Sequence, residues 1–249
     1  MAIVSQENIL SILTTFNPWW QNGVVPKAFV KEFHRSSYYT CRKSLLSDLR
    51  RIVVMSGARR TGKTTIMYQL IHDLLEQGVK PQNILFFTFD HPLIRMAGMD
   101  QVLNIYKNNI SDDAHFYMFV DEVQFDKDWT NYLKMAYDMN PDMRSVATGS
   151  ASAAIEDDVR ESGAGRWTVI KVTTLSFYEY CALKGISKAQ SVDDVFRIHT
   201  LSKQQQTQLM MGLSDLQIHL MRYMQIGGFP ELVKTEDVPY AQKLIREDV

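Results

Sequence analysis

The residues best suited to chemistry form a run of eight at positions 57–64, Gly-Ala-Arg-Arg-Thr-Gly-Lys-Thr. This run matches G-x-x-x-x-G-K-[ST], the spacing with which a loop and the helix after it bind the phosphates of a nucleotide. Gly57 and Gly62 let the backbone wrap a phosphate because neither has a Cβ that would clash. Lys63 would contact the β and γ phosphates, and the Thr64 hydroxyl would bind Mg²⁺. The residues expected to contact the nucleotide are Gly57, Arg60, Thr61, Gly62, Lys63, Thr64 and Thr65.

A second candidate site follows the apolar run HFYMFV at residues 115–120 and consists of Asp121 and Glu122. If this run is a strand of a parallel sheet, both carboxylates lie at the carboxyl edge of the sheet, where open α/β folds bind ligands. Asp121 would then hold the magnesium ion through water, and Glu122 would be the general base that activates the attacking water. The alternative interpretation is a solvated acidic turn.

Two later positions are candidates for sensing the γ-phosphate. Ser150, or failing that Thr148, ends the short apolar run of residues 145–147. The alternative for Ser150 is a helix N-cap, a common use of serine, and both roles are compatible. Arg166 follows a glycine-rich turn and is a candidate arginine finger, acting on its own nucleotide or on that of a neighbouring subunit; the alternative is a surface arginine.

The hydrophobic pattern predicts the helices and strands that position these residues. Short, nearly continuous apolar runs predict strands buried on both faces, and the segments between them have helical spacing. The predicted strands are residues 52–55, 84–89, 116–120, 145–147 and 167–172, and the predicted helices are residues 64–77, 99–110, 129–139 and 151–159. This alternation predicts an α/β fold with a parallel sheet. The strand at residues 84–89 separates the phosphate loop from the acidic pair, an arrangement typical of the additional-strand ATPases.

The chain after residue 175 has helical patterns only. The predicted helices are residues 176–183, 192–199, 215–225 and 239–246. We therefore predict a helical lead-in at residues 1–50, a core at 51–174 and a helical lid at 175–249, which ends in mid-pattern and is expected to be truncated at its C-terminus. The Gly-Gly-Phe-Pro segment at 227–230 is either a lid loop that meets the nucleotide or an ordinary turn between helices.

The charge and the residue composition of the chain limit which classes of function it can have. The chain of 249 residues has a net charge of −1, which provides no overall electrostatic reason to bind nucleic acid or an anionic membrane. The segment from Lys27 to Lys63, however, contains ten basic residues and only two acidic ones. Four of them (Arg42, Lys43, Arg50 and Arg51) form either a solvated helix face or a nucleic-acid contact. The two cysteines are far apart in the sequence, which favours a reducing compartment. The sequence also has no apolar stretch long enough to span a membrane and no signal peptide. We therefore expect a cytoplasmic protein.

Several motifs together resemble a known family, the bacterial and archaeal AAA-type ATPases. The matching residues are 57–64, Asp121-Glu122-Val123-Gln124, Trp129, 148–150, Gly165-Arg166, 175–180 and 227–231. The resemblance covers about residues 35–235 and implies a five-stranded parallel AAA-like core of order 5-1-4-3-2 with a helical lid. Members of this family generally continue into a winged-helix segment and a nuclease-like domain, which this chain does not include.

These observations together predict a Mg²⁺-dependent ATP hydrolase that binds ATP and ADP and is a possible homo-oligomer. Adenine is favoured over guanine because the guanine-reading Asn/Thr-Lys-x-Asp motif is absent from the sequence. A slow nucleotide-controlled switch or assembly module is the first alternative, and a nucleic-acid-directed ATPase is the second. A phosphotransferase is the least favoured, because no acceptor-binding motif is evident and Glu122 suits water.

Overall fold

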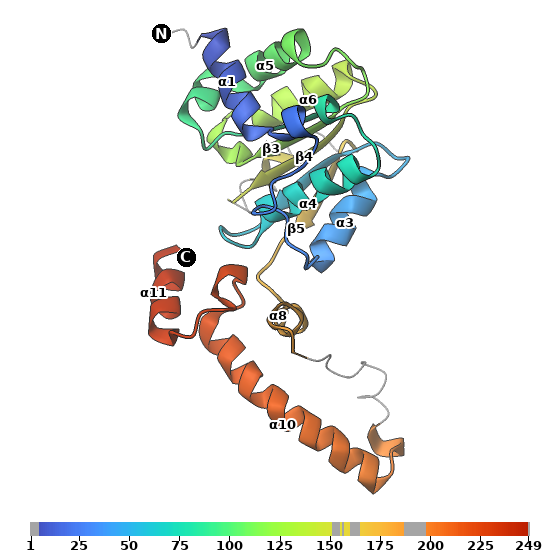
Figure 1. Ribbon diagram of the computed structural model, residues 1–249, viewed down its shortest axis with the longest axis vertical. Coiled ribbons are helices and arrows are strands. Elements are labelled where there is room, and N and C mark those ends of the chain that lie inside the picture. The colour runs from blue at the N-terminus through green and yellow to red at the C-terminus, as the bar shows by residue number, and fades with distance from the viewer. Residues whose placement is uncertain (1–4, 151–154, 156, 160–164, 187–197, 249) are drawn as a thin grey trace. The chain divides into compact units, whose positions relative to one another are not determined.

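The computed structural model of the chain describes residues 5–150, 155, 157–159, 165–186 and 198–248 (Figure 1). It divides into an α/β unit (Met1–Ala58 and Gly62–Val172) and a helical unit (Arg59–Thr61 and Thr173–Val249). The helices predicted over residues 151–159 and 192–199, and the glycine-rich turn before Arg166, lie largely outside the described residues.

A five-stranded parallel sheet forms the centre of the α/β unit. Its strands are β1 (Ile52–Ser56), β2 (Ile84–Thr88), β3 (Tyr117–Asp121), β4 (Arg144–Gly149) and β5 (Trp167–Lys171). Their order across the sheet is β2-β3-β4-β1-β5, which confirms the predicted AAA-like topology. Every residue of β1 and of β3 is buried, as expected for strands covered on both faces.

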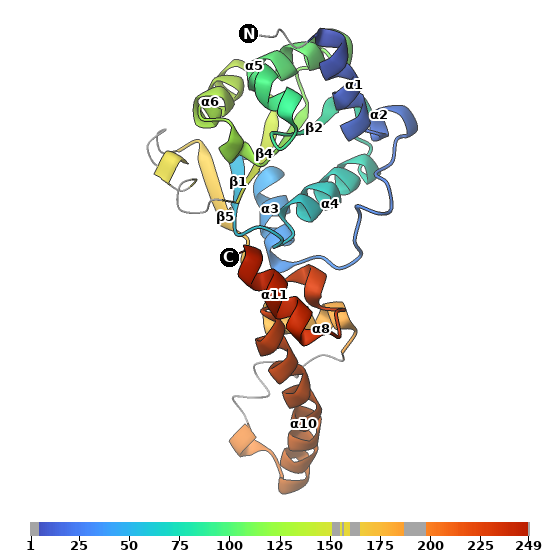
Figure 2. The same ribbon diagram turned by 90° about the vertical axis from the view of Figure 1, so that its left-hand side faces the viewer.

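Helices cover both faces of this sheet (Figure 2). One face carries α3 (Ser36–Leu45) and α4 (Lys63–Glu76), and the opposite face carries α5 (Pro92–Asn109) and α6 (Trp129–Met139). Right-handed crossovers explain the division, because the chain crosses the sheet in one direction from β1 to β2 and in the other from β2 through β3 to β4. Helix α5 begins before the predicted residue 99 and contains a break at Gly98, where φ is 74°.

The N-terminal segment closes the outer edge of β2. It consists of α1 (Gln6–Phe16) and α2 (Trp19–Asn22), with the buried Asn17 between them. The Asn17 side chain accepts from the Phe86 N–H at 2.6 Å and donates to the Phe86 carbonyl at 2.8 Å. The indole N–H groups of Trp19 and Trp20 both donate to the Ile84 carbonyl, at 3.0 and 2.8 Å. Side chains thus satisfy backbone groups of the edge strand that no neighbouring strand pairs.

The helical unit has its own small apolar core. Its helices are α8 (Phe177–Lys184), α10 (Lys203–Ile226) and α11 (Val238–Asp248), with short 3-10 turns at Ile198–Thr200 and Pro230–Leu232. The core side chains are Leu175, Tyr180, Cys181, Ile226, Phe229, Leu232, Val233 and Ala241. In the described part of the chain, no helix is both long enough and apolar enough to cross a membrane.

The paired glycines of the helical unit have a structural use. Gly227 ends α10 in the left-handed conformation, with a φ of 72°. Gly228 has a φ of 68°, and a Cβ at this position would lie 2.8 Å from the Leu175 carbonyl oxygen. The Leu175 N–H donates to the Gly228 carbonyl at 2.7 Å, so this close approach joins the start of the unit to the end of α10. These contacts are those of a turn between helices.

Candidate functional site

The candidate residues come together because three strand ends meet at one edge of the sheet. In the register of the parallel strands, Ser56 of β1 lies opposite Gly149 of β4, and Val120 of β3 lies opposite Ala147. The end of β4 therefore lies between the start of the phosphate loop and the acidic pair. The Gly57 N–H donates to the Gly149 carbonyl at 3.3 Å, which continues this pairing into the loop.

The loop of residues 57–64 has the backbone of an anion site. Arg60 and Gly62 have positive φ values of 61° and 92°, and alternation of backbone handedness turns successive N–H groups into one concavity. Helix α4 begins directly after Gly62 without a side-chain N-cap and without an acidic residue in its first turn. The positive end of its dipole is therefore directed toward the loop, where it favours a phosphate.

The cation of this loop is Lys63, the first residue of α4. Its side chain is buried, and Nζ donates to the carbonyl oxygens of Gly57 and Ala58, both at 2.8 Å. These contacts hold the ammonium group inside the loop, where the sequence motif places it. Thr61 is also buried, and Thr65, in the first turn of α4, is half-buried.

One hydrogen bond joins the loop to the acidic strand: the Thr64 hydroxyl donates to Oδ2 of Asp121 at 3.0 Å. Magnesium takes oxygen ligands and usually keeps several of its waters. The Thr64 hydroxyl fits as a direct ligand of that ion, and the neighbouring Asp121 carboxylate fits a water bound to it. The other carboxylate oxygen of Asp121 accepts from the Thr148 hydroxyl.

Burial is the main influence on the pKa of Asp121, and it raises that pKa above its ordinary range. Hydrogen bonds from Thr148 and Thr64 and the positive charge of Lys63 act in the opposite direction, while the charge of Glu122 adds to the rise. A buried carboxylate with this net shift gains from a bound cation, because the cation offsets the loss of hydration.

Glu122 is held in an unusual backbone conformation. Its φ and ψ are 55° and 49°, the left-handed region that residues other than glycine rarely adopt. Its N–H donates to the Thr148 hydroxyl at 3.1 Å, and its carboxylate accepts from the side-chain amide of Gln124. The turn directs the chain into the 3-10 helix Val123–Phe125 immediately after β3. Such strain persists only where surrounding contacts compensate for it, and it is often found at functional sites.

Ser150 is bound to Gln124 through both its side chain and its backbone. Gln124 Nε2 donates to Ser150 Oγ at 2.8 Å, and the Ser150 N–H donates to Gln124 Oε1 at 3.3 Å. The sequence motif contains Gln124, but nothing in its spacing assigns this residue a role. The contact exists because the ends of β3 and β4 lie side by side in the sheet.

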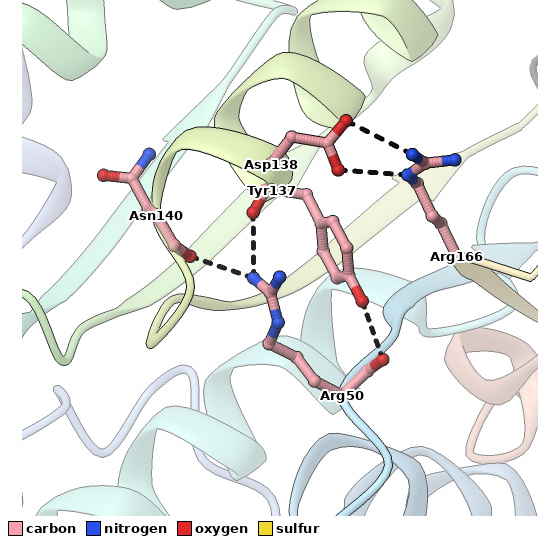
Figure 3. A network of polar contacts seen from close by, with 5 residues as sticks. All are labelled: Arg50, Tyr137, Asp138, Asn140 and Arg166. Carbon is pink, nitrogen blue, oxygen red and sulfur yellow. Dashed lines mark hydrogen bonds and ion pairs between the residues drawn. The ribbon is translucent and has the colours of Figure 1, made fainter.

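Arg166 does not lie near the other candidate residues. It directly precedes β5, and its carbonyl accepts from the N–H of Ile52 at the start of β1. Because β1 and β5 are parallel, Arg166 lies at the edge of the sheet opposite to the phosphate loop. Its guanidinium pairs with the Asp138 carboxylate at 3.1 Å (Figure 3). An interaction with the nucleotide of its own chain would require it to cross a five-residue strand, about 16 Å.

Three of the four basic side chains proposed for nucleic-acid contact are bound by the protein itself. Arg42 pairs with Asp73 at 3.0 Å, and Arg51 donates to the carbonyl of Trp167 at 3.2 Å. Arg50 donates to two carbonyls at the end of α6, both at 2.9 Å, and its guanidinium lies over the Tyr137 ring (Figure 3). These contacts favour a structural role for the three residues.

A family profile described as an AAA domain (AAA_14) matches residues 49–181, which is more than half of the chain. The chain belongs to this AAA domain family. The match begins just before β1 and ends within α8. It therefore includes every strand of the sheet and every candidate site residue, and nucleotide binding is what an AAA domain suggests.

Curated relatives of this AAA domain chain are uncharacterized and longer. A protein of Haemophilus influenzae is 28% identical over 193 residues, which cover 75% of this chain and 41% of that protein. The protein MJ1544 of Methanocaldococcus jannaschii is 22% identical, with 79% of this chain and 40% of that protein covered. The chain thus spans about two fifths of the length of these relatives.

Solved structures of similar fold are distant in sequence. Aeropyrum pernix Orc1 in complex with DNA has a TM-score of 0.48 and 12% identity, over 68% of this chain and 51% of that one. The S. cerevisiae Hsp104–ADP complex has a TM-score of 0.44 and 16% identity, over 72% of this chain and 26% of that one.

Proposed function

We propose that this AAA domain is a Mg²⁺-dependent ATP hydrolase. The observation that carries the proposal is the hydrogen bond between Thr64 and Asp121, because it places the phosphate loop and the acidic pair at a single site. Nucleotide hydrolysis requires a loop that binds the phosphates, oxygen groups that hold a cation, and a carboxylate close to that cation. ATP is preferred over GTP because the sequence lacks the guanine-reading motif.

Each part has a defined role in this proposal. The loop residues Gly57–Gly62 and Thr65 bind the phosphates through backbone N–H groups and hydroxyls, and Lys63 neutralises charge on the β and γ phosphates. Thr64 and Asp121 hold Mg²⁺, which when bound would stabilise the negative charge that develops on the transferred group. Glu122 accepts the proton of the water whose oxygen bonds to the γ-phosphorus as the bond to ADP breaks. Ser150, at the end of β4, contacts the γ-phosphate.

For Arg166 we propose action on the site of a neighbouring subunit. Its place at the opposite edge of the sheet is remote from its own phosphate loop and accessible from outside, since its side chain is more than one third exposed. An arginine in this position completes the site of another copy only if the amino-terminal ends of the strands in one copy lie next to the carboxyl-terminal ends in the other. Mixing Arg166→Ala protein with Glu122→Gln protein tests this: activity that exceeds the sum of the two separate preparations is expected.

The nucleic-acid-directed alternative is less well supported, because Arg42, Arg50 and Arg51 are bound by internal partners. Among the residues that the structure describes, no specific contact favours the slow-switch alternative over hydrolysis. The partner on which the whole protein acts depends on the longer chains in which the relatives carry this domain.

Two substitutions test the proposal. Lys63→Ala is expected to weaken ATP binding about 10- to 100-fold, since it removes charge-assisted hydrogen bonds of about 1.5–3 kcal/mol. Glu122→Gln is expected to preserve ATP binding and to lower kcat by about 10²- to 10⁴-fold, the usual contribution of a general base. Lys134→Ala on α6 and Glu76→Gln at the exposed end of α4 are the matched controls.

Calorimetry with Mg–ATP and steady-state phosphate release are the two measurements. Normal turnover by the Glu122→Gln protein would contradict the role of the carboxylate. Undiminished ATP binding by the Lys63→Ala protein would contradict the site itself.

A further inference from the structure

The side-chain amide of Gln124 links the end of β3 to the end of β4. Its Nε2 group donates one hydrogen to the Glu122 carboxylate and one to Ser150 Oγ, and its Oε1 accepts the Ser150 N–H. An amide offers two N–H donors and one carbonyl acceptor, so these contacts use all three groups. The opposite orientation of the amide would place Oε1 against a carboxylate and Nε2 against an N–H, which excludes it.

Gly149 lies beside both the amide of Gln124 and the side chain of Ile155. A Cβ at Gly149 would lie 1.8 Å from Cδ1 of Ile155 and 3.0 Å from Gln124 Oε1. Gly149 is not among the residues with positive φ, so the need for glycine here is one of space, mainly for Ile155 and to a smaller extent for the amide. Thr148 binds the acidic pair and Ser150 binds the amide.

Glu122 is consequently fixed at two points. Thr148 accepts its backbone N–H, and Gln124 donates to its carboxylate. The first contact sets the strained backbone turn, and the second sets the direction of the charged group. A glutamate side chain has three rotatable bonds, so its carboxylate would sample several rotamers without the second contact.

We infer that Gln124 is the positioning residue for Glu122, and that it ties the direction of this carboxylate to Ser150. The inference rests on the proposed function, because it concerns the base of the hydrolytic step. Gln124 contacts the carboxylate and the serine, so its effect on the reaction passes through them. The residue that contacts the γ-phosphate and the residue that takes the proton from water are thereby connected through one amide.

The variants that test this inference differ only in what they place at residue 124. Gln124→Met has a similar length without the hydrogen bonds, and misplacement of the base is expected to lower kcat about 10- to 100-fold. The Kd for Mg–ATP, measured by calorimetry, is expected to stay within about 3-fold, since no phosphate contact is removed. Gln124→Glu is expected to lower kcat as well, because a second carboxylate cannot donate a hydrogen bond to Glu122 and repels it.

The matched control is Gln82→Met. Gln82 Nε2 donates to the Trp20 carbonyl at 2.9 Å near the amino end of β2, so the substitution removes a comparable contact far from the site. Its kcat and its Kd for Mg–ATP are expected to match those of the unmodified protein. Ser150→Ala combined with Gln124→Met is expected to reduce kcat by less than the product of the two separate reductions, because the bond between these two residues is lost in either single variant.

The outcomes separate this inference from the proposed function. A Gln124→Met protein with kcat within about 2-fold of the unmodified chain would overturn the inference and leave the hydrolase intact. Effects of the two substitutions that multiply independently would also overturn it, because they would show no link through the amide. If the unmodified protein does not hydrolyse ATP, both the proposed function and the inference fail. Retained Mg–ATP affinity in the two Gln124 variants establishes that the site is folded.

Discussion

The Thr148 hydroxyl is the buried group that contacts both residues of the acidic pair, and Thr148→Val is the substitution that tests it. Thr148 is fully buried, and its hydroxyl donates to Asp121 and accepts from the Glu122 N–H at 3.1 Å. Valine has nearly the same shape as threonine and also favours strands, so the change removes two hydrogen bonds without opening a cavity.

The expected loss of stability follows from these two contacts. A hydrogen bond to a charged group contributes about 1.5–3 kcal/mol. The Glu122 N–H loses its acceptor, which costs about 1 kcal/mol where water can replace the partner in part. Together the free energy of unfolding should fall by about 3 kcal/mol, equivalent to about 6–12 °C in Tm for a chain of this size.

The loss should depend on pH. The pKa of Asp121 is already raised from its ordinary 3.8 by burial, and the bond from Thr148 lowers it. Without that bond the folded-state pKa rises further. A carboxyl with a raised pKa contributes its stability fully below the unfolded pKa and loses it as pH rises through the folded pKa. The free energy of unfolding of the Thr148→Val protein should therefore be lower than that of the unmodified protein by a larger amount at pH 7 than at pH 4.

Tryptophan fluorescence in urea is the suitable assay, because all four tryptophans lie in the α/β unit. Thr148→Ser keeps the hydroxyl and should cost only about 1 kcal/mol for the lost methyl group. Thr168→Val makes the same change at a half-exposed position of β5 and should be nearly neutral. A Thr148→Val protein as stable as the Thr168→Val protein at pH 7 would refute this account of the site.

Three further predictions concern the α/β unit. Asp121→Asn removes a buried charge and should raise Tm without nucleotide by about 2–4 °C at pH 7, for a gain of about 1 kcal/mol, while Mg–ATP binding measured by calorimetry is lost. Asn17→Leu leaves the Phe86 N–H and carbonyl unpaired, and urea unfolding should show a loss of about 2–4 kcal/mol; an unchanged midpoint would contradict the pairing. Arg50→Met removes a charged cap from the end of α6 and should lower stability by about 1–2 kcal/mol with Mg–ATP affinity unaltered, whereas a large loss of affinity would argue against a purely structural role.

The strands and the phosphate loop were predictable because their signals are local. Buried parallel strands require nearly continuous apolar runs, and a phosphate loop requires glycines and a lysine at set intervals. The strand order followed from the resemblance of the motifs to a known family, and the structure confirms it. Placement of Asp121 beside Thr64 then follows from strand register, because the carboxyl ends of parallel strands share one edge.

The contacts of Gln124 were not predictable from the pattern, because they join side chains 26 residues apart across two strand ends. The same is true of Asn17, whose side chain bonds to the backbone of a strand 69 residues away. For Arg166, a glycine-rich turn beside an arginine suggested reach toward a phosphate, but strand direction places it at the other edge. Tertiary geometry, rather than local propensity, decides each of these cases.

The side chains on the outside of β2 also limit how the protein can associate with other chains. An approaching strand would need a free N–H and free carbonyls along β2, and those of Phe86 and Ile84 are already bound to Asn17, Trp19 and Trp20. Exposed strand edges are the usual starting points for misassembly by strand addition. Removal of the first twenty residues would expose this edge of β2 to pairing with strands of other chains.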